Sequence, residues 1–575
     1  MERNRTESGN LNFGVKKGGR MNAKSHIPLM ASLLKAKGVK HVVIAPGSRN
    51  APLIQSFFKE FGDKCLSIVD ERSAGYFALG IALKSQTPVV VITTSGTAAL
   101  NLAPAIAEAF YQGVPLITIT ADRPAEWIGQ QDNQVIHQQN IFGNNCKASF
   151  ELPVECTCPE DLWLSNRIVN EAYNKTIAGK SGPVHINVPL REPLYDELPV
   201  STEHSIIETI APAAIEINEE LVTTWKKAKR ILIVCGQQSR DQNLNVVLNQ
   251  FTKDSRVVVL SESTGNVRGE NILHNPDLLF QHSEKELINL KPELVVYYGG
   301  QVVSKRIKTY LRTVLCEFWY VSPGGLYVDT FKRLSKVIQA DVAGFFTSLY
   351  KKVESVNGSD YSQRWQLLYA KALEAIGFQT KNVEFSDLWV TKQIANKLQP
   401  EAILFAGNSS MIRYLQFFQN NSLEVFANRG TSGIDGCVST AAGIAKVTDK
   451  KVFAVVGDLS FVYDSNGLWN KSLSANLKII VVNNKGGGIF SMIPGPAQQM
   501  GFEEFFQAHH PVSIKKITEA FNLDYTFCSD AESFEKSFLA FSASKKAAVL
   551  EIETLSDINT RVFTNFVKNL KNEYK

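Results

Sequence analysis

The sequence predicts an α/β protein of three domains, each a mostly parallel sheet with helices on both faces. Short β-branched runs alternate with helix patterns along the chain, which is typical of parallel α/β sheets. At 575 residues the chain is too long for one hydrophobic core. Most strand-like runs end in a Gly or polar turn, so ligand-binding residues are expected at the carboxyl ends of the strands.

Four strand-like runs in the first third are each followed by a polar turn. The runs are residues 42–45, 66–69, 89–93 and 116–120, and the turns are 46–49, 70–72, 94–97 and 121–124. Amphipathic helix patterns follow over residues 73–83 and from the third turn through Ala109. These turns lie at the carboxyl ends of the strands, where we expect the first sheet to bind its ligands.

Pro-rich and polar passages suggest the domain boundaries. Residues 183–199 predict the exit from the first domain, and residues 351–362 the next linker. We therefore expect a disordered extension over 1–20 and domains over 21–198, 199–355 and 356–575. The expected strands are 231–235, 257–260, 294–298 and 318–321 in the central domain, and 403–406, 425–427, 452–456 and 479–482 in the last.

The composition excludes several functional classes. No apolar run approaches the roughly 20 residues that cross a bilayer. The net charge of +5 is dispersed along the chain, so nucleic acid is not an expected partner. The eight cysteines include one close pair, Cys156 and Cys158, with no second pair at zinc spacing. Free thiols in a reducing cytoplasm are the expectation.

The strongest local signal lies at the ends of two neighbouring runs in the last domain. Gly457-Asp458 ends one run, and Asn483-Asn484 ends the next. Aspartate and asparagine oxygens at adjacent strand ends can bind one hard cation, and Mg²⁺ prefers few protein ligands plus phosphate oxygens. Either dipeptide alone would be interpreted as a turn. Their spacing, with a helix fitted between them, favours a diphosphate-bound Mg²⁺, with Mn²⁺ as a possible substitute.

This spacing resembles the cofactor motif of the thiamine-diphosphate enzymes related to pyruvate decarboxylase and acetolactate synthase. The resemblance implies metal ligands Asp458, Asn484 and the backbone carbonyl of Gly486. It departs from the general pattern at Leu459, where glycine is usual. Ile434 is similar to the bulky residue that bends the cofactor in that family, although a core isoleucine is the simpler interpretation.

Glu71 resembles the family's catalytic glutamate, which hydrogen-bonds the cofactor's aminopyrimidine so that it can remove a proton. It follows the second run of the first domain. The alternative is an exposed acid favoured by a helix N-terminus. Because the family places this glutamate and the metal site on different subunits, the resemblance implies a homodimer or a dimer of dimers.

Longer strings resemble one branch of these enzymes, the 2-succinyl-5-enolpyruvyl-6-hydroxy-3-cyclohexene-1-carboxylate (SEPHCHC) synthase family of the menaquinone pathway. In the first domain they are APGSRNAPL (45–53), DER (70–72), TTSGTA (93–98), TADRP (120–124) and DNQ (132–134). In the last domain they are GNS (407–409), NRGTSGIDG (428–436), GDLS (457–460) and VNNKGGGIF (482–490). Leucine after Gly-Asp is part of this branch's pattern.

The resemblance implies decarboxylation of 2-oxoglutarate and 1,4-addition of the succinyl-semialdehyde carbanion equivalent to isochorismate. Both substrates carry two carboxylates, and guanidinium groups bind carboxylates in a bidentate manner. Any single arginine in a loop is more often merely solvated. The implied substrate-binding residues are Ser48, Arg49, Arg123, Asn133, Gln134, Lys305, Ser409, Arg413, Arg429 and Phe490. The implied cofactor-binding residues are Glu71, Ser95, Gly96, Ser409, Gly433, Ile434, Asp458, Leu459, Ser460, Asn484, Ile489 and Phe490.

Two other functions stay open. One is a different thiamine-dependent 2-oxoacid decarboxylase or acetolactate-synthase-like carboligase, although small monoanionic substrates would not need the arginine set. The other is a catalytically silent homologue that serves as a scaffold. The residues Glu71, Asp458 and Asn484 are all present, which argues against the scaffold.

Overall fold

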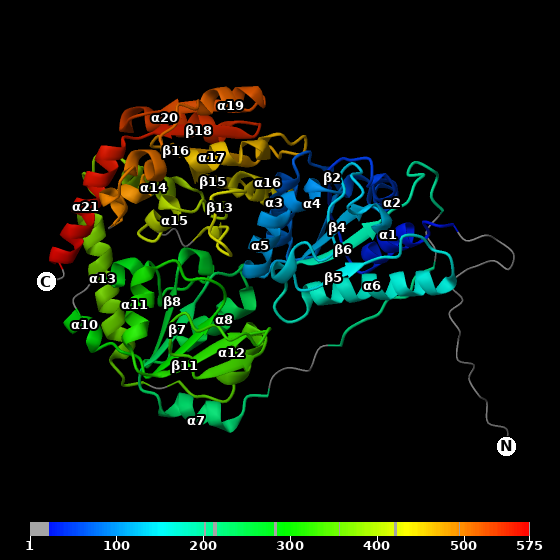
Figure 1. Cartoon of the computed structure of the whole chain (residues 1–575). Coiled ribbons are helices and arrows are strands. Elements are labelled where there is room, and N and C mark those ends of the chain that lie inside the picture. The colour runs from blue at the N-terminus through cyan, green and yellow to red at the C-terminus, as the bar shows by residue number, and fades with distance from the viewer. Residues whose placement is uncertain are drawn as a thin grey trace, which may run out of the picture. The chain divides into compact units, whose positions relative to one another are not determined.

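The computed structural model describes residues 22–199, 203–210, 216–280, 284–355, 357–418, 422–493 and 495–573. The extension expected over residues 1–20 lies outside these ranges. The chain divides into two compact units, Met1–Ile210 and Ala211–Lys575, whose elements are labelled in Figure 1. Three six-stranded parallel sheets are present in the described residues, one in the first unit and two in the second. The predicted fold class is confirmed.

The sheet of the first unit has the strand order β2-β1-β3-β4-β6-β5. Every pairing in it is parallel, so the carboxyl ends of its strands share one edge. Buried aliphatic side chains fill the strands because a parallel sheet is covered on both faces. Its strands are β1 (Val42–Ile44), β2 (Cys65–Ser67), β3 (Val89–Thr93), β4 (Leu116–Asp122), β5 (Ser149–Glu151) and β6 (Val184–Pro189).

Helices cover this sheet and several of them begin near the carboxyl ends of its strands. Residues of α1, α2 and α6 pack with Val42, Val90 and Ile117 in one core cluster, while α3 packs along β1, β3 and β4. The helices are α1 (His26–Ala36), α2 (Ala51–Phe61), α3 (Glu71–Ser85), α4 (Thr97–Asn101), α5 (Ala103–Gln112) and α6 (Pro159–Ile177).

Two expectations for the first unit need correction. The helix expected to run through Ala109 is broken into α4 and α5 at Leu102. Pro104 explains the break, because proline cannot donate the backbone hydrogen bond of a helix interior and suits the first turn of α5. The passage 183–199, interpreted as a domain exit, begins with the buried strand β6, so the chain leaves the sheet only after Pro189.

The second sheet, with strand order β12-β11-β10-β7-β8-β9, forms the first part of the second unit. Alternate residues of β7 belong to different core clusters: Ile231 and Ile233 pack with α7, α8 and α12, whereas Leu232 and Val234 pack with α9, α10, α11 and α13. Both faces are therefore covered. The elements are β7 (Ile231–Cys235), β8 (Val257–Ser261), β9 (Ile272–Leu273), β10 (Leu294–Tyr298), β11 (Glu317–Ser322) and β12 (Lys336–Gln339), with α7 (Glu219–Lys227), α8 (Gln242–Phe251), α9 (Pro276–Leu279), α10 (Glu284–Ile288), α11 (Lys305–Thr313) and α12 (Val342–Tyr350).

The third sheet has the order β14-β13-β15-β16-β18-β17 and is again wholly parallel. Its strands are β13 (Ile403–Ala406), β14 (Glu424–Phe426), β15 (Val452–Gly457), β16 (Leu477–Asn483), β17 (Asp524–Cys528) and β18 (Ala548–Glu553). Its helices are α13 (Tyr361–Gln379), α14 (Asp387–Lys397), α15 (Ser410–Tyr414), α16 (Cys437–Lys446), α17 (Asp458–Tyr463), α18 (Ile489–Met492), α19 (Ile514–Ala520), α20 (Ala531–Ala543) and α21 (Ser556–Glu573).

The second and third sheets are joined by shared packing. The N-terminal half of α13 contributes Trp365 to the core of the second sheet, and its C-terminal half contributes Ile376 to that of the third. The amide group of Asn266 exchanges two hydrogen bonds of 2.8 Å with the backbone of Val425 in β14. These contacts fix the loop that follows β14 relative to both sheets.

Two further expectations concern thiols and membrane spans. The eight cysteines are free in the structure, which agrees with the sequence. Among the described helices, none combines the length and the apolar character that a bilayer crossing demands.

Candidate functional site

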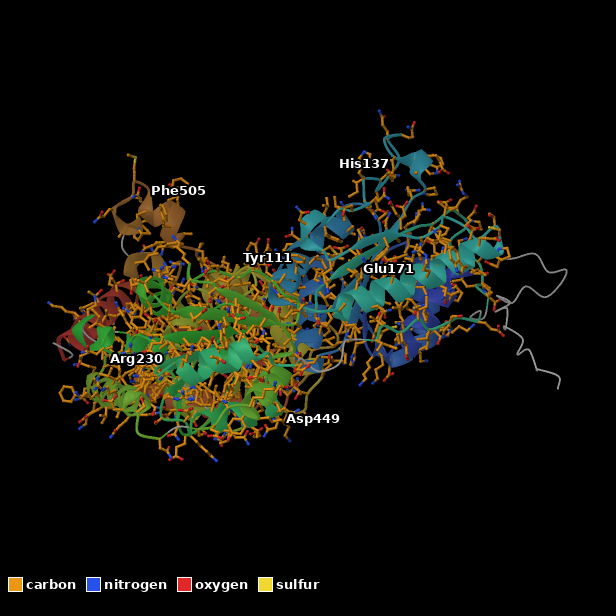
Figure 2. The ribbon with its side chains drawn as sticks, turned by 90° about the horizontal axis from the view of Figure 1, so that it is seen from below. Tyr111, His137, Glu171, Arg230, Asp449 and Phe505 are labelled. Atoms are coloured by element: carbon orange, nitrogen blue, oxygen red, sulfur yellow. The ribbon has the colours of Figure 1, made fainter. Side chains whose placement is uncertain are left out.

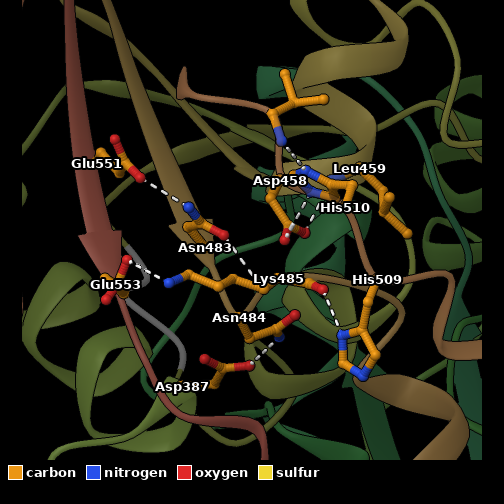
Figure 3. Close-up of polar contacts among 11 residues, drawn as sticks. Asp387, Asp458, Leu459, Asn483, Asn484, Lys485, His509, His510, Glu551 and Glu553 are labelled. Carbon is orange, nitrogen blue, oxygen red and sulfur yellow. Dashed lines mark hydrogen bonds and ion pairs between the residues drawn. The ribbon is translucent and has the colours of Figure 1, made fainter. Parts of the chain in front are cut away.

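Asp458 and Asn484 lie at the ends of neighbouring strands in the second unit. Gly457 in β15 pairs with Val482 in β16, so the residues that follow both strands emerge at one edge. Asp458 begins α17 and is 2% exposed, and Asn484 is 9% exposed. The structure therefore brings together the two side chains that the sequence predicts as metal ligands (Figure 3).

Among the residues that the structure describes, each carboxylate oxygen of Asp458 has one hydrogen-bond partner. The backbone N–H of Leu459 donates to Oδ1 at 2.8 Å. The Nε2 atom of His510 lies 3.2 Å from Oδ2, and this contact raises the pKa of His510. A carboxylate with so few donors keeps lone pairs free for a cation.

Asn484 is held by a carboxylate behind it. Its Nδ2 donates to Oδ2 of Asp387, the first residue of α14, at 3.0 Å. Asp387 is fully buried, and burial raises its pKa to about 6. The Oδ1 atom of Asn484 is buried and has no hydrogen-bond partner among the described residues. An orphaned buried oxygen of this kind calls for an unseen ligand.

These residues fit a hard cation bound to a diphosphate. A buried carboxylate and an unpartnered amide oxygen are oxygen donors of the type Mg²⁺ selects, and phosphate and water oxygens usually complete its shell. The described residues contain no group of three His, Cys, Asp or Glu side chains that could hold a metal, so an all-carboxylate or thiolate centre is absent from them. The carbonyl of Gly486 accepts from the N–H of Gly488 at 3.0 Å and retains a second lone pair.

The backbone around Gly486 is crowded. Its φ is +156°, and a Cβ there would lie 2.4 Å from the carbonyl oxygen of Gln507. The segment Phe502–Gln507, a π-helical turn, thus rests directly on the strand-end loop. Its Phe505 is 75% exposed and stands out from the second unit in Figure 2. Only glycine allows this close approach at position 486.

A second set of contacts shapes the loop that carries Gly433 and Ile434. The Ser460 hydroxyl donates to the carbonyl of Ile434 at 2.6 Å, and Asn408 Nδ2 donates to the carbonyl of Gly433 at 2.6 Å. Ile434 is 36% exposed, so the interpretation of a fully packed core isoleucine is wrong. This loop lies against α17, the helix that Asp458 begins.

Ser409 has a strained backbone. Its φ is +68° and its ψ is −122°, a region that residues other than glycine rarely adopt and that clusters at ligand sites. It precedes α15, and its carbonyl accepts from Arg413 NH1 at 2.6 Å. Arg413 itself is exposed.

Arg429 is buried at the junction of the two sheets of the second unit. Its guanidinium donates to Asn408 Oδ1 at 2.9 Å and to Gln301 Oε1 at 3.3 Å. Gln301 comes from the second sheet and also donates to the carbonyl of Gly430 at 3.2 Å. The guanidinium is thus held in one orientation.

Lys305 begins α11 and is exposed. The turn before it is fixed by Glu262, whose carboxylate accepts the N–H groups of Val303 and Ser304 at 2.6 and 2.7 Å. Glu262 is 3% exposed, and burial raises its pKa to about 7. The second sheet therefore presents Lys305 on a firmly anchored turn.

Apolar side chains lie beside the strand ends of the third sheet. Leu459, Ile489 and Phe490 are all partly buried. The ring of Phe490 packs edge-on against Phe506, with centroids 5.7 Å apart. The predicted apolar residues are thus partly open to an incoming molecule.

Glu71 occupies the expected strand end in the first unit. It is the first residue of α3, behind the cap residue Asp70, whose carboxylate accepts the N–H of Ser73 at 2.9 Å. Glu71 is half-buried. Glu71 thus lies at the edge formed by the carboxyl ends of the strands of the first sheet.

Arg49 and Arg123 lie in the turns after β1 and β4 and are paired within the chain. Arg49 is 6% exposed; it donates to the carbonyl of Leu190 at 3.0 Å and pairs with Glu192 at 3.2 Å. Arg123 pairs with Asp132 at 3.0 Å. Burial, followed by the charge of Arg123, lowers the pKa of Arg49. Two guanidinium groups that repel each other at one edge suit an anionic ligand.

The remaining predicted residues of the first unit lie in the loops after β1, β3 and β4. Gly96 has φ +79°, and a Cβ there would lie 3.2 Å from the backbone of Gln134. Ser95 is buried, whereas Ser48, Asn133 and Gln134 are exposed. Gln134 belongs to the segment that carries His137, which extends outward in Figure 2.

Sequence reasoning missed five polar residues at these edges: Gln138, Glu262, Gln301, Asp387 and His510. Gln138 is fully buried and accepts the N–H of Gly96 at 2.7 Å while donating to the carbonyl of Ala121 at 3.0 Å. Glu262 directly follows β8, and Gln301 lies in the turn after β10, so their places at strand ends were a signal, as was the helix start of Asp387 after Ser386. Gln138 and His510 do not follow a strand directly.

Models of three thiamine pyrophosphate enzyme domains match the chain in order. The N-terminal TPP binding domain matches residues 27–141, the middle domain residues 200–406 and the C-terminal TPP binding domain residues 406–552. The chain is accordingly an enzyme of the thiamine-diphosphate-using type.

The similar proteins with an assigned name identify a more specific family than the domain models do. A protein of Desulfotalea psychrophila named 2-succinyl-5-enolpyruvyl-6-hydroxy-3-cyclohexene-1-carboxylate synthase is 41% identical to this chain. The match covers 90% of this chain and 96% of the relative. The same name belongs to relatives from Cytophaga hutchinsonii, 38% identical over 94% of this chain and 98% of the relative, and from Flavobacterium johnsoniae, 37% identical over 94% and 97%. The chain therefore belongs to the SEPHCHC synthase family of thiamine pyrophosphate enzymes.

Proposed function

We propose that this protein catalyses the SEPHCHC synthase reaction: decarboxylation of 2-oxoglutarate and 1,4-addition of the resulting succinyl unit to isochorismate. The observation that carries the proposal is the similarity to synthases of this name over at least 90% of the chain. This assignment makes the protein a Mg²⁺-dependent transferase, with Mn²⁺ as a substitute. A cytoplasmic location is part of the same proposal.

The cofactor's diphosphate and its metal are assigned to the strand ends of the third sheet. Asp458 and the free Oδ1 of Asn484 would bind Mg²⁺ from the protein side, together with the carbonyl of Gly486. Ser409, Gly433 and Ser460 would surround the diphosphate. Bound thiamine diphosphate supplies the carbon nucleophile and the electron acceptor for loss of carbon dioxide.

Residues of this chain would orient the substrates and control protons. The Glu71 carboxylate would hold a proton at the aminopyrimidine ring, next to Ser95 and Gly96. Ile434, between the Ser460 and Asn408 contacts, would press on the cofactor. Leu459, Ile489 and Phe490 would exclude water from the reacting carbon, because a proton from water would end the reaction before the second substrate adds.

Basic side chains would bind the four substrate carboxylates. The buried guanidinium groups of Arg49 and Arg429 are held in place by partners of the chain, so little side-chain entropy is lost on binding. Arg123, Arg413 and Lys305 are the other proposed cationic contacts. Ser48, Asn133, Gln134 and Ser409 would donate or accept hydrogen bonds at substrate oxygens.

The same assignment implies a homodimer or a dimer of dimers. In it, Glu71 of one subunit would complete the metal site of the other. The proposed domains remain residues 21–198, 199–355 and 356–575.

The reaction can be tested directly with purified protein, thiamine diphosphate and Mg²⁺. Isochorismate loss and carbon dioxide release are followed with 2-oxoglutarate as donor, and then with pyruvate. We expect consumption of both substrates in equal amounts with 2-oxoglutarate only. Equal turnover with pyruvate, or carbon dioxide release without isochorismate loss, would reassign the chain to a simpler carboligase or decarboxylase.

The shared site can be tested by mixing two inactive variants. Glu71→Gln and Asp458→Asn each damage a different half of the site. If the halves come from different subunits, the mixed dimer contains one intact site, and activity returns on mixing and subunit exchange. Mixtures that stay inactive although subunits exchange would place both residues in the same subunit's site.

A further inference from the structure

The side-chain amide of Asn484 has nearly the same shape in its two possible orientations. Its amide group carries one oxygen and one NH₂ of almost equal size, and only the oxygen binds a cation. Nothing in the strand-end turn itself decides which of the two faces outward. The neighbouring Asn483 is fixed separately: its Nδ2 donates to Glu551 at 2.7 Å, and its Oδ1 accepts the N–H of Lys485 at 3.0 Å. The orientation of Asn484 must therefore be set from elsewhere.

Asp387 supplies that information. Its Oδ2 lies 3.0 Å from Asn484 Nδ2, and a carboxylate oxygen can only accept a hydrogen bond while ionised. If the amide were turned around, two oxygens would face each other in a buried environment. With the amide as observed, Oδ1 points away from Asp387 and is left without a partner among the described residues (Figure 3).

Asp387 is in turn held by a buried polar network. Thr554 donates its hydroxyl to Oδ1 of Asp387 at 2.7 Å. Asn559 accepts the backbone N–H of Asp387 at 2.8 Å and donates to the Thr554 hydroxyl at 3.1 Å. Thr554, Asn559 and Asp387 are 3%, 1% and 0% exposed. Three elements, α14, the end of β18 and α21, thus meet at one carboxylate.

Burial of the Asp387 carboxylate costs folding free energy, because the charged group loses its contacts with water. The described side chains that donate to the two oxygens of Asp387, Thr554 and Asn484, are neutral. Its place at the first turn of α14 lowers that cost through the helix dipole. An apolar residue at position 387 would fill the space without the desolvation penalty but would leave Asn484 free to turn.

We propose that Asp387 is a positioning residue that holds the Asn484 amide with its oxygen toward the metal ion. This inference rests on the proposed function, because it assumes that Asn484 is a metal ligand. Outer partners that fix metal ligands commonly contribute about 10- to 100-fold in metal affinity. Asp387 itself does not contact the metal in this proposal.

The test measures metal binding rather than turnover. Mn²⁺ is titrated into protein with saturating thiamine diphosphate, and free Mn²⁺ is counted by electron paramagnetic resonance. Asp387→Ala is expected to raise the Kd of Mn²⁺ by about 10- to 100-fold. Asp530→Ala removes another helix-start acid of the same sheet, one that accepts the N–H of Ser533 at 2.8 Å. It is expected to leave this Kd within about twofold, since Asp530 follows β17, which β18 separates from β16.

A second background separates positioning from general damage. In Asn484→Asp, either oxygen of the new carboxylate can face the metal, so orientation is no longer needed. Two adjacent carboxylates then repel each other, and removing Asp387 should leave the Kd unchanged or lower it. A reversal of this kind supports the inference. An equal loss of affinity in both backgrounds, or none in the native one, would overturn it.

The outcomes also separate this inference from the proposed function. If the unaltered protein with thiamine diphosphate binds no Mn²⁺, the proposed metal site is wrong and the inference falls with it. If it binds Mn²⁺ and Asp387→Ala binds equally well, only the inference is wrong. Should circular dichroism find Asp387→Ala unfolded, the same cycle is run with Asp387→Asn. For that variant a several-fold loss confined to the Asn484 background is expected, and a loss in both backgrounds overturns the inference.

Discussion

The Nε2 atom of His510 lies 3.2 Å from Oδ2 of Asp458, the carboxylate proposed to bind the metal. The His510 side chain is 12% exposed, and the Asp458 side chain is 2% exposed. An imidazole N–H and a cation compete for the same oxygen lone pairs. In the proposed function, the loop 508–513, which carries His510, would therefore be coupled to the occupancy of the metal site.

His510→Ala should tighten metal binding. Without the imidazole, the Leu459 N–H is the donor that remains on the carboxylate among the described residues. The Kd of Mg²⁺ with thiamine diphosphate should therefore fall several-fold, the equivalent of about 1 kcal/mol for one hydrogen bond. Calorimetric titration measures this Kd. His509→Ala, which leaves the Asp458 contact in place, serves as control. A weaker Kd for His510→Ala would mean that the imidazole supports the metal instead of competing with it.

Glu71→Gln should slow cofactor activation without loss of metal binding. Glutamine cannot hold the exchangeable proton of a carboxylic acid, and general acid–base groups contribute about 10²- to 10⁴-fold. Exchange of the thiazolium C2 proton for deuterium, followed by NMR, reports this step alone. Glu60→Gln, on the surface helix α2, is the matched control. Exchange at the native rate in Glu71→Gln would remove this glutamate from the mechanism.

Arg429→Ala should weaken binding of an anionic substrate. One charged hydrogen bond contributes about 1.5–3 kcal/mol, so the KM for 2-oxoglutarate or isochorismate should rise by at least tenfold. Both KM values are measured at saturating levels of the other substrate. Gln301→Ala removes a partner of Arg429 and should give a smaller increase for the same substrate. Unchanged KM values in Arg429→Ala would leave that residue with a structural role only.

Gly47→Ala should destabilise the first unit. A Cβ at position 47 would lie 2.4 Å from the Cβ of Thr94, so the turns after β1 and β3 would have to separate. Overpacking of this kind costs about 1–3 kcal/mol of unfolding free energy. Hydrogen exchange in β1 and β3 measures the loss. Gly377→Ala, which meets no atom within 4 Å, should cost nothing, and equal protection in both variants would contradict the close contact.

His185 should make the first sheet sensitive to acid. Burial lowers its pKa from 6.5 to about 3, so between these values the unfolded state binds a proton that the folded state rejects. Its contribution to stability is complete above pH 6.5 and is lost as the pH falls toward 3, at about 1.4 kcal/mol per pH unit.

Hydrogen exchange of β4 and β6 at several pH values between 5 and 7 tests this prediction. After correction for the intrinsic exchange rate, the free energy of opening should fall with acidification, and His185→Gln should reduce that slope by one proton. The exposed His137→Gln should leave the slope unchanged. A native slope that persists in His185→Gln would assign the acid sensitivity to other groups, such as the buried His26, whose pKa is lowered to about 4.

The sequence predicted the strands that carry the site more successfully than those at the sheet edges. Strands β3, β7, β10 and β13 have the predicted bounds, because continuous aliphatic runs between turn residues mark strands buried on both faces. The strands β5, β9, β12 and β17 were not predicted. They are edge strands, and their short or mixed runs carry little hydrophobic signal. Strands β6 and β18 were also missed, although each lies inside its sheet.

The sequence by itself determined which residues could serve chemistry: Asp458, Asn484 and Glu71 each follow a recognisable strand, and parallel strands place their carboxyl ends together. Only the tertiary structure decided how those groups are held. Asp387 lies 97 positions from Asn484, and Gln301 lies 128 positions from Arg429. Hydrogen bonds between residues so far apart in the sequence depend on the order of the strands in a sheet and on the packing of one sheet against another. A local pattern of residues encodes neither of these.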